Sequence, residues 1–411
     1  MVAIAHEYSE DIQDIRSAIE SFIRAEVFPR HEKHAALFDD ERRKYGANGA
    51  YSKEVWQLVS EVRQASAKAG FYQMSAPAEF GGGGLGLLAY YAAWERIYHL
   101  CGMKYWIGHY MVSHWAKGPS PVLRNLTKRA QDEYLPGLME GKTTMCFGMS
   151  EPDAGSDAMA MKTRAVPDGD GWRITGGKIW TSNSPQADYV VVFAVTEPEL
   201  AAKRKGGISA FIVPTKSEGF SVESVIKMWG HAGGDEGILR FDNVRVEPHQ
   251  LIGELHKGFR TAMLGVSLGR LYNASRAIGV CRWGLEMALD YTKIRHTFGK
   301  PISEYQGVTF PLAERATEVH AAHLMGRNAA ELLDRGLPAT KELSMAKSYA
   351  AEIGARCLDQ VIQTHGAIGF TNEMYLTEAY IMLRRINVAD GSREIMRRQI
   401  VKSLLDGDVD L

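Results

Sequence analysis

The sequence has few cysteines and no long apolar segment. Its four cysteines, in a chain of 411 residues, are too far apart for a Cys-x-x-Cys metal or redox pair. We therefore expect four reduced, mostly buried thiols at Cys101, Cys146, Cys281 and Cys357. The longest strongly apolar run, Tyr189–Val195, is far shorter than the roughly 18 residues that span a bilayer. This length argues against membrane insertion.

The chain also lacks an excess of charge and a targeting segment. Its formal net charge is −1 at pH 7, so no global field favours nucleic acid or an anionic membrane. The N-terminus does not place a basic stretch before an apolar core, as a signal peptide would. We expect a soluble cytoplasmic protein, or a mitochondrial matrix protein if the source is eukaryotic and the chain mature. We predict no metal site.

Three regions differ in their hydrophobic period. Residues 1–142 repeat apolar side chains at helical spacing, with breaks at the glycines of 81–84 and at Pro119 and Pro121. Residues 143–255 are short, β-branched and aromatic, and residues 256–411 return to long helical patterns. We predict an α+β, mainly α, protein. It should contain an N-terminal helical domain, a middle β domain and a C-terminal four-helix bundle with these boundaries.

In the middle region, strand patterns follow one another without helices between them. Asp168-Gly-Asp-Gly171 lies between two strand patterns and predicts a hairpin or short loop. Further strands are expected at 189–196, 208–214 and 238–246. This order favours an antiparallel barrel or sandwich over a βαβ sheet, and we predict an antiparallel β-barrel.

Several motifs match known sites without their structural context. Gly265-Val-Ser-Leu-Gly269 fits the serine-hydrolase pattern but lies in or beside a helical pattern, where a nucleophile elbow does not form. The glycines of 81–84 precede no Gly-Lys-Ser/Thr, so a turn is expected there instead of a phosphate loop. His31-Glu-Lys-His34 is one residue short of a zinc motif, and we expect surface histidines.

Two segments of the middle region fit a planar ligand. Residues 147–157 begin as a strand and end in a Pro/Gly/Ser/Asp turn, which exposes backbone N–H groups and small hydroxyls. Residues 178–183 place Trp180 beside Thr181 and Ser182, so an aromatic face adjoins two hydroxyl groups. Each segment alone is equally compatible with a core tryptophan and ordinary turns.

Taken together, these segments resemble the acyl-CoA dehydrogenase family. The resemblance continues in order through Arg295-His-Thr-Phe-Gly-Lys300 with Gln306, Gln363-Thr-His-Gly-Ala-Ile-Gly369 and Asp390-Gly-Ser-Arg-Glu-Ile395. Pro77-Ala-Glu-Phe-Gly-Gly82 also looks like a loop of the family's N-terminal domain. The family has the same three-region architecture, so the resemblance covers nearly the whole chain.

The resemblance implies an FAD cofactor and assigns residues to it. The strand and turn, with the tryptophan segment, would contact the isoalloxazine ring and pyrophosphate through Phe147, Met149, Ser150, Ser156, Trp180, Thr181 and Ser182. The adenosine and pyrophosphate end would be reached, across a subunit interface, by Arg295, Thr297, Phe298, Gln306, Gln363, Thr364, Gly366 and Ala367. Ser392 and Glu394 would hold FAD from the catalytic loop.

The resemblance also implies α,β-desaturation of an acyl-CoA thioester. Asp390 would remove the α proton, flavin N5 would take the β hydride, and Ser156, Arg270 and Gly391 would contact substrate. An electron-transfer flavoprotein would accept the electrons. A homo-oligomer, typically a tetramer, is expected.

The sequence departs from the family at the base. Most members have Glu where this chain has Asp390, whose carboxylate is set back by about 1.5 Å. This requires a compensating shift or a bulkier substrate. Some members carry the base just before the position of Arg270, where this chain has Gly269 and so no base. Ser267 replaces a common aspartate near substrate, and Ala367 replaces a second glycine.

Several alternatives stay open. Asp390 is also a candidate N-cap of a helix over 392–405. The protein could be a nitroalkane-oxidase-type flavin oxidase, because that relative also uses Asp, or a non-catalytic partner subunit. Residues 38–51 look like a solvated insertion or a cover over the acyl pocket. An aromatic group, either core or pocket lining, comprises Tyr98, Tyr105, Trp106, Tyr110 and Trp115.

Overall fold

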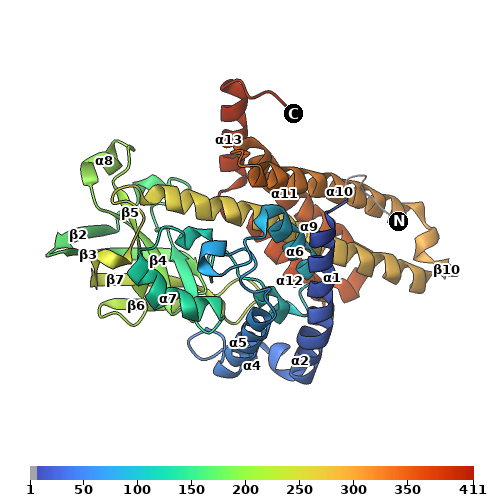
Figure 1. Cartoon of the computed structure of the whole chain (residues 1–411). Helices are drawn as coiled ribbons and strands as arrows, with labels where there is room; N and C mark the ends of the chain where they lie inside the picture. Colours follow the sequence, from blue (N-terminus) through green and yellow to red (C-terminus); the bar gives the residue numbers. More distant parts are fainter. Residues whose placement is uncertain (1–6) are drawn as a thin grey trace. The chain divides into compact units, whose positions relative to one another are not determined.

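The computed structural model describes residues 7–411, which form two compact units. Unit 1 is mainly helical and comprises residues 7–29, Leu85–His109 and Gly269–Leu411. Unit 2 contains the large sheet and comprises Arg30–Gly84 and Tyr110–Leu268. Each unit is assembled from segments that are far apart in sequence, which Figure 1 shows by colour.

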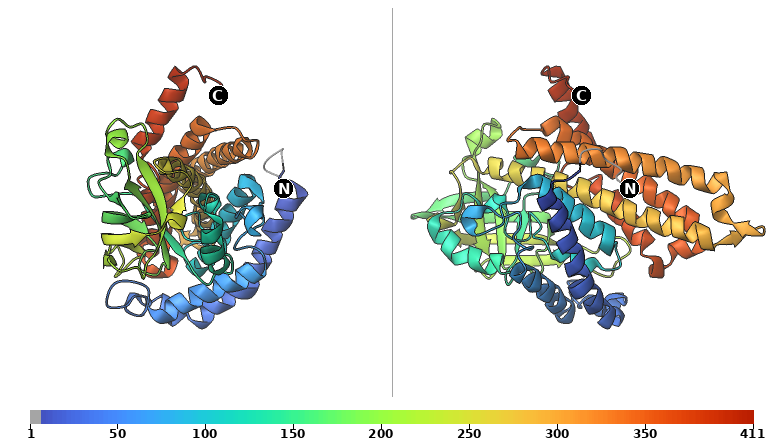
Figure 2. Two further views of the ribbon diagram at one scale, coloured as in Figure 1. Left: turned by 60° about the vertical axis from the view of Figure 1, so that its left-hand side comes forward. Right: turned by 45° about the vertical axis from the view of Figure 1, so that its right-hand side comes forward.

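Unit 1 is built on long helices. α9 (Gly258–Ile294) begins in unit 2 and continues through unit 1. The other main helices are α1 (Glu10–Phe22), α6 (Gly86–Cys101), α10 (Gln306–Asp334), α11 (Thr340–His365), α12 (Leu376–Ile386) and α13 (Arg393–Leu405). α2 (Phe28–Lys33) begins in unit 1 and ends in unit 2. α11 packs against α10, α12 and α13, and both views of Figure 2 show α10 and α11 side by side. The helical bundle expected at the C-terminus is therefore present.

The apolar stripe of α9 explains why the bundle forms. Leu271, Ala274 and Ile278, one helical turn apart, are all buried, and the stripe continues through buried Cys281 and Leu285. Burial of this stripe removes apolar surface from water and stabilises the bundle. All four cysteines are free and buried, as expected.

Unit 2 is organised around an eight-stranded sheet. Its strands are β1 (Met145–Gly148), β2 (Arg164–Asp168), β3 (Gly171–Ser182), β4 (Tyr189–Val195), β5 (Ile208–Pro214), β6 (Phe220–Val225), β7 (Glu236–Val246) and β8 (Leu251–Ile252). The order is β6-β7-β3-β2-β4-β5-β8, and β1 pairs with β4. The hairpin predicted at 168–171 is confirmed, because Asp168 pairs with Gly171 in an antiparallel ladder.

The prediction of a closed antiparallel barrel is wrong. β6 and β8 end the strand order unpaired with each other, and β1 runs parallel to β4. β2 meets β4 only at Arg164 and Val195, also in parallel. The two halves of the sheet still share one core, in which the Trp172 and Phe211 rings lie 5.4 Å apart. Side-chain packing between the two halves buries the apolar residues that a barrel would bury by closure.

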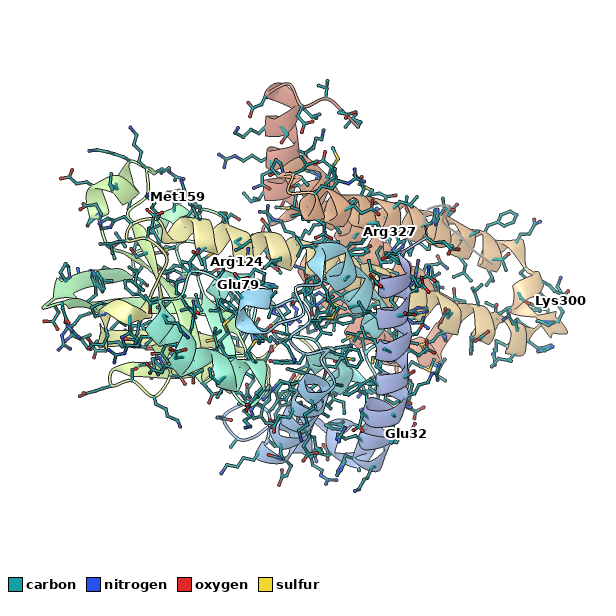
Figure 3. The ribbon with its side chains drawn as sticks, in the orientation of Figure 1. Glu32, Glu79, Arg124, Met159, Lys300 and Arg327 are labelled. Atoms are coloured by element: carbon teal, nitrogen blue, oxygen red, sulfur yellow. The ribbon has the colours of Figure 1, made fainter. Side chains whose placement is uncertain are left out.

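Unit 2 also contains helices and loops. The helices are α3 (Ala35–Phe38), α4 (Glu41–Lys44), α5 (Lys53–Lys68), α7 (Lys128–Met139) and α8 (Pro198–Ala202). Glu79 and Arg124, labelled in Figure 3, join two loops by an ion pair of 3.0 Å. No helix among residues 7–411 combines the length and apolarity that a membrane crossing requires.

The segment 38–51 is not a loop surrounded by solvent. Tyr45 and Tyr51 form an antiparallel bridge with rings stacked at 5.3 Å, and the backbone of Gly49 accepts a hydrogen bond from Gly234. Glu41 also accepts from the Ala232 N–H at 2.8 Å. The insertion therefore packs on the loop between β6 and β7. Its charged composition had indicated a solvated segment and gave no sign of this packing.

Two further expectations have clear outcomes. The serine of Gly265–Gly269 lies inside α9, so the nucleophile elbow is absent, as predicted. His31 is buried and its ring stacks on Phe38 at 4.9 Å, so the expectation that it is a surface residue was wrong. Aromatic packing, which the His-x-x-His spacing did not show, accounts for its position.

Candidate active site

Backbone contacts in unit 2 bring the two predicted flavin segments together. The N–H of Ile179 in β3 donates to the carbonyl of Ser150 at 2.9 Å. The Lys178 ammonium donates to the Met149 carbonyl at 3.2 Å. The turn after β1 and the end of β3 therefore lie side by side, although 27 residues separate Glu151 from Lys178.

A buried ion pair fixes this junction. The Lys178 ammonium lies 2.8 Å from Glu151, and only 0% and 6% of the two side chains are exposed. Glu151 also accepts from the backbone N–H groups of Lys162 at 2.5 Å and Thr163 at 3.0 Å. Burial raises the pKa of Glu151, but the Lys178 charge and these donors outweigh it and hold the pKa below its ordinary value. Neither role could be predicted from the sequence, because no local pattern signals the pairing of Glu151 with Lys178.

Trp180 is held in an unusual backbone conformation. Its φ is +59° at a register shift between Lys178 and Thr181 in the β3–β7 ladder, and its side chain is 56% exposed. The buried hydroxyl of Thr181 has no hydrogen-bond partner among residues 7–411. A free indole face beside an unsatisfied buried hydroxyl fits a planar heteroaromatic ligand with polar edge atoms.

The other residues predicted at the ring are in the same part of unit 2. The Phe147 ring packs 4.8 Å from both Trp115 and Phe193, so it is part of an aromatic cluster. Ser182 pairs with Glu236 in the β3–β7 ladder. Ser156 is exposed on the turn, next to Asp157, which pairs with Arg204 at 2.5 Å.

In unit 1, Asp390 lies on the tight loop between α12 and α13. Asp390 and Gly391 have φ values of +53° and +98°. The backbone of this loop is held from two helices: Arg270 donates to the Asp390 carbonyl at 3.2 Å, and Lys347 donates to the Gly391 carbonyl at 2.7 Å. Asn273 donates to the Asp390 carboxylate at 2.7 Å. A non-glycine residue at positive φ needs such support.

The charge around Asp390 is mainly positive. Burial raises the pKa of Asp390 above its ordinary value, and Lys347, Arg276, Asn273 and Arg270 oppose this shift without cancelling it. Burial also lowers the pKa of Lys347 to about 8. A partly desolvated carboxylate with a raised pKa is well suited to accept a proton.

The proposed N-cap role of Asp390 is wrong. α13 begins at Arg393, and its N-cap is Ser392, whose hydroxyl accepts from the Ile395 N–H at 3.4 Å. Ser392 takes this role because its side chain is the one at the correct position before the first turn. Glu394, also predicted at the flavin, is exposed and pairs with Arg393 at 3.0 Å.

Arg270, predicted to contact substrate, is already engaged. Beyond the Asp390 carbonyl, its guanidinium donates to Gln399 at 2.8 Å, and Gln399 accepts from Ser344 at 2.9 Å. These contacts tie α9 and α11 to α13. Arg270 therefore positions the loop that carries Asp390, and its contact with substrate remains a prediction.

The remaining cofactor residues gather at the other end of the long helices. Arg295, Thr297 and Phe298 belong to the hairpin of β9 (His296–Thr297) and β10 (Lys300–Pro301), whose tip is marked by Lys300 in Figure 3. The end of α11 lies nearby, because the rings of Tyr291 and His365 stack at 4.7 Å. Phe298 is 94% exposed. This cluster gathers the residues expected at one end of the cofactor: Arg295, Thr297, Phe298, Gln306, Gln363, Thr364, Gly366 and Ala367.

This cluster is distant from Asp390 within one chain. Asn273, which touches Asp390, and Arg295 are 22 residues apart along a helix at a rise of about 1.5 Å per residue, or roughly 33 Å. Within unit 1 of one chain, the structure therefore does not bring the Asp390 loop together with the cofactor residues near Arg295.

The aromatic group noted in the N-terminal region is divided. Tyr98, Tyr105 and Trp106 belong to unit 1, whereas Tyr110 and Trp115 belong to unit 2. Tyr98 and Trp106 are buried, and so is Trp115. Within the described residues, no group of three or more His, Cys, Asp or Glu side chains is arranged to hold a metal ion.

Comparisons with known proteins agree across the whole chain. Models described as acyl-CoA dehydrogenase N-terminal, middle and C-terminal domains match residues 9–142, 146–244 and 256–405. The chain is 33% identical over 399 residues to the short-chain specific acyl-CoA dehydrogenase, mitochondrial, of Bos taurus, covering 97% of this chain and 91% of that protein.

Two further relatives extend the comparison. The caffeyl-CoA reductase-Etf complex subunit CarC of Acetobacterium woodii is 34% identical over 353 residues, covering 86% of this chain and 92% of that protein. The crystal structure of acyl-CoA dehydrogenase from Geobacillus kaustophilus has a TM-score of 0.83 at 25% identity, covering 98% of this chain and 100% of that one. The chain belongs to the acyl-CoA dehydrogenase family of flavin-dependent oxidoreductases.

Proposed function

We propose that this protein is an FAD-dependent acyl-CoA dehydrogenase in which Asp390 removes the α proton of a CoA thioester. The observation that carries the proposal is the setting of Asp390. Its carboxylate is partly desolvated, is oriented by Asn273 and lies on a loop that Arg270 and Lys347 hold in a fixed conformation. A positioned base of this kind typically accelerates proton transfer by about 10²–10⁴-fold.

The backbone of the same loop supplies a second group. The N–H of Asp390 donates to no backbone carbonyl among residues 7–411. We assign it to the thioester carbonyl, where a hydrogen bond would stabilise the negative charge that develops as the α proton leaves. We propose that this loop conformation, with Asp390 at positive φ, places the carboxylate within reach of the α proton although its side chain is shorter than that of Glu.

Unit 2 supplies residues that fit FAD. Trp180 would cover the isoalloxazine ring, and the unsatisfied Thr181 hydroxyl would bond to its edge. Phe147, Met149, Ser150, Ser156 and Ser182 would complete this part of the site, while Ser392 and Glu394 would contact FAD from the catalytic loop. When bound, FAD supplies the acceptor of the substrate's β hydride.

The proposal extends to partners. One relative is named as part of a reductase-Etf complex, which supports an electron-transfer flavoprotein as the redox partner here. The same name describes a reductase, and we propose that the redox partner sets the net direction of the reaction here. We propose a homo-oligomer, in which Arg295 and the residues near it reach the FAD of a neighbouring subunit.

Asp390→Asn tests the proposal. The variant keeps its fold and the loop contacts, so it should remain yellow, while anaerobic flavin bleaching by an acyl-CoA substrate should slow by about 10²–10⁴-fold. Exposed Asp406→Asn, in an ion pair with Lys402, is the matched control. Wild-type rates in Asp390→Asn would assign the base elsewhere.

The wild-type protein distinguishes the remaining alternatives. If no member of a broad acyl-CoA panel bleaches the flavin, the dehydrogenase assignment fails. Rapid oxygen consumption with nitroethane would then identify an oxidase, and a colourless protein without FAD would identify a non-catalytic subunit.

A further inference from the structure

Arg276 is a partly buried cation that forms no salt bridge with a carboxylate among residues 7–411, and Asp390 is the carboxylate that interacts with it electrostatically. It lies on α9 one helical turn after Asn273, and its Nε has no hydrogen-bond partner among the described residues, although the atom is shielded from solvent. Its guanidinium lies over the Tyr272 ring, 4.7 Å from the centroid, and donates weakly to the Tyr272 hydroxyl at 3.4 Å. These contacts orient the guanidinium plane. Together with Tyr98 and the Asp390 charge they outweigh burial and raise the pKa of Arg276, so the group stays a cation.

Apart from Arg276, the charged groups in this part of unit 1 already have close partners. Arg270 and Lys347 are occupied by the loop carbonyls and Gln399. Glu95, the buried carboxylate of α6, pairs with Arg282 at 2.6 Å and Arg16 at 3.4 Å. Asp390 interacts electrostatically with Arg276, but its carboxylate is bonded by Asn273. Three cations, Arg270, Arg276 and Lys347, thus surround one carboxylate.

Three cations around a single carboxylate leave an excess of positive charge in a partly desolvated region, which points to a ligand that supplies a second anion. The Arg276 fork is planar and pre-oriented by the Tyr272 ring, which suits bidentate binding of a carboxylate. The hydroxyls of Tyr98 and Tyr272, 2.6 Å apart, add polar groups beside it. An unsubstituted hydrocarbon chain would satisfy none of these groups.

We propose that Arg276 binds a second carboxylate carried by the acyl group, so that the substrates are CoA monothioesters of short dicarboxylic acids. Arg276 is three residues from Asn273, about 4.5 Å along α9, and Asn273 touches Asp390. The second carboxylate therefore lies only a few bonds from the carbon that loses its proton. This inference rests on the proposed function and narrows it to one substrate class.

The test compares thioesters that differ only in charge. Succinyl-, glutaryl- and adipyl-CoA are each compared with their methyl monoesters and with straight-chain acyl-CoAs of similar length. The readouts are kcat/KM with an artificial electron acceptor and the rate of anaerobic flavin reduction. We expect the wild type to favour at least one dicarboxylic thioester over its neutral partner by 10²-fold or more, because sites built to bond a polar group reject analogues that lack it.

Variants of Arg276 test whether this residue causes the preference for charged thioesters. Arg276→Gln should keep the flavin absorbance but lose the preference for the charged thioester, because kcat/KM should fall further for the dicarboxylic thioester than for its neutral ester. Arg276→Lys should retain part of the preference. Exposed Arg397→Gln, on α13, should behave as the wild type. The inference is overturned if the wild type prefers neutral thioesters, or if Arg276→Gln slows both classes equally, since Arg276 would then serve Asp390 alone. No bleaching with any acyl-CoA would overturn the proposed function itself, whereas bleaching without charge preference would overturn only this inference.

Discussion

Asn273 and the Asp390 carboxylate form the most informative pair at the residue scale. Asp390 acts as a base only when ionised, and burial raises its pKa, so activity should fall at a higher pH on acidification than for an exposed aspartate. The Asn273 amide donates to the ionised carboxylate and therefore lowers the pKa. Removing this donor raises the pKa further, because the charged form alone loses a hydrogen bond of about 1.5–3 kcal/mol.

We therefore expect Asn273→Leu to move the acidic limb of the kcat/KM profile to higher pH. The measurement is flavin reduction across a pH series, with the same substrate for each variant. Asn328→Leu, at an exposed position of α10, is the control and should leave the profile unchanged. A shift of the limb to lower pH would show that Asn273 does not stabilise the ionised base.

The sequence identified Asp390 but not its surroundings. Its segment resembles a family motif, whereas Asn273 lies 117 residues earlier and Lys347 approaches Gly391 across 44 residues. A local pattern cannot show such pairs, because the helix packing that creates them is not encoded within either segment. The one available signal was the presence of the polar residues Asn273 and Arg276 among the apolar residues of a long helical pattern.

At the scale of elements, the junction of β1 with β3 depends on the Glu151–Lys178 pair. Removing one partner leaves the other charge buried and unpaired, which typically costs about 3–5 kcal/mol. Lys178→Met should lower the free energy of unfolding by that amount and weaken flavin retention, because the Met149 carbonyl loses its donor. Urea unfolding followed by circular dichroism measures the first effect and flavin release the second.

Two further variants separate charge burial from general damage. Glu151→Gln combined with Lys178→Met removes both charges and should be less destabilised than Lys178→Met alone. Lys402→Met removes an exposed partner of Asp406 and should change stability by no more than about 1 kcal/mol. Equal losses for Lys178→Met and Lys402→Met would mean that the buried pair does not hold the junction.

Elements with local signals were predicted well, and long-range pairings were not. The strands at 189–196, 208–214 and 238–246 are present as β4, β5 and β7, because alternating or continuous β-branched residues specify strands locally. The parallel pairing of β1 with β4 depends on contacts between residues 145–148 and 189–192. No turn or alternation fixes that register, so the closed barrel was a reasonable but wrong extrapolation.

At the scale of the whole molecule, one chain carries two halves of a cofactor site that do not meet within unit 1. About 33 Å of α9 separates the Asp390 region from Arg295, by the helical rise, and the hairpin at the far end exposes 94% of Phe298. An exposed aromatic side chain beside an arginine is suited to contact outside its own chain. This arrangement supports a site completed by a second subunit.

Mixed oligomers test this division directly. Asp390→Asn and Arg295→Ala should each be inactive alone, the first for lack of a base and the second through weakened FAD binding. When the two chains, carrying different affinity tags, are co-expressed, a site that takes Asp390 from one chain and Arg295 from the other is intact. With random pairing in a two-fold symmetric assembly, about a quarter of the sites should regain wild-type activity. Doubly tagged oligomers with no more activity than either parent would place all of these residues in the site of a single chain.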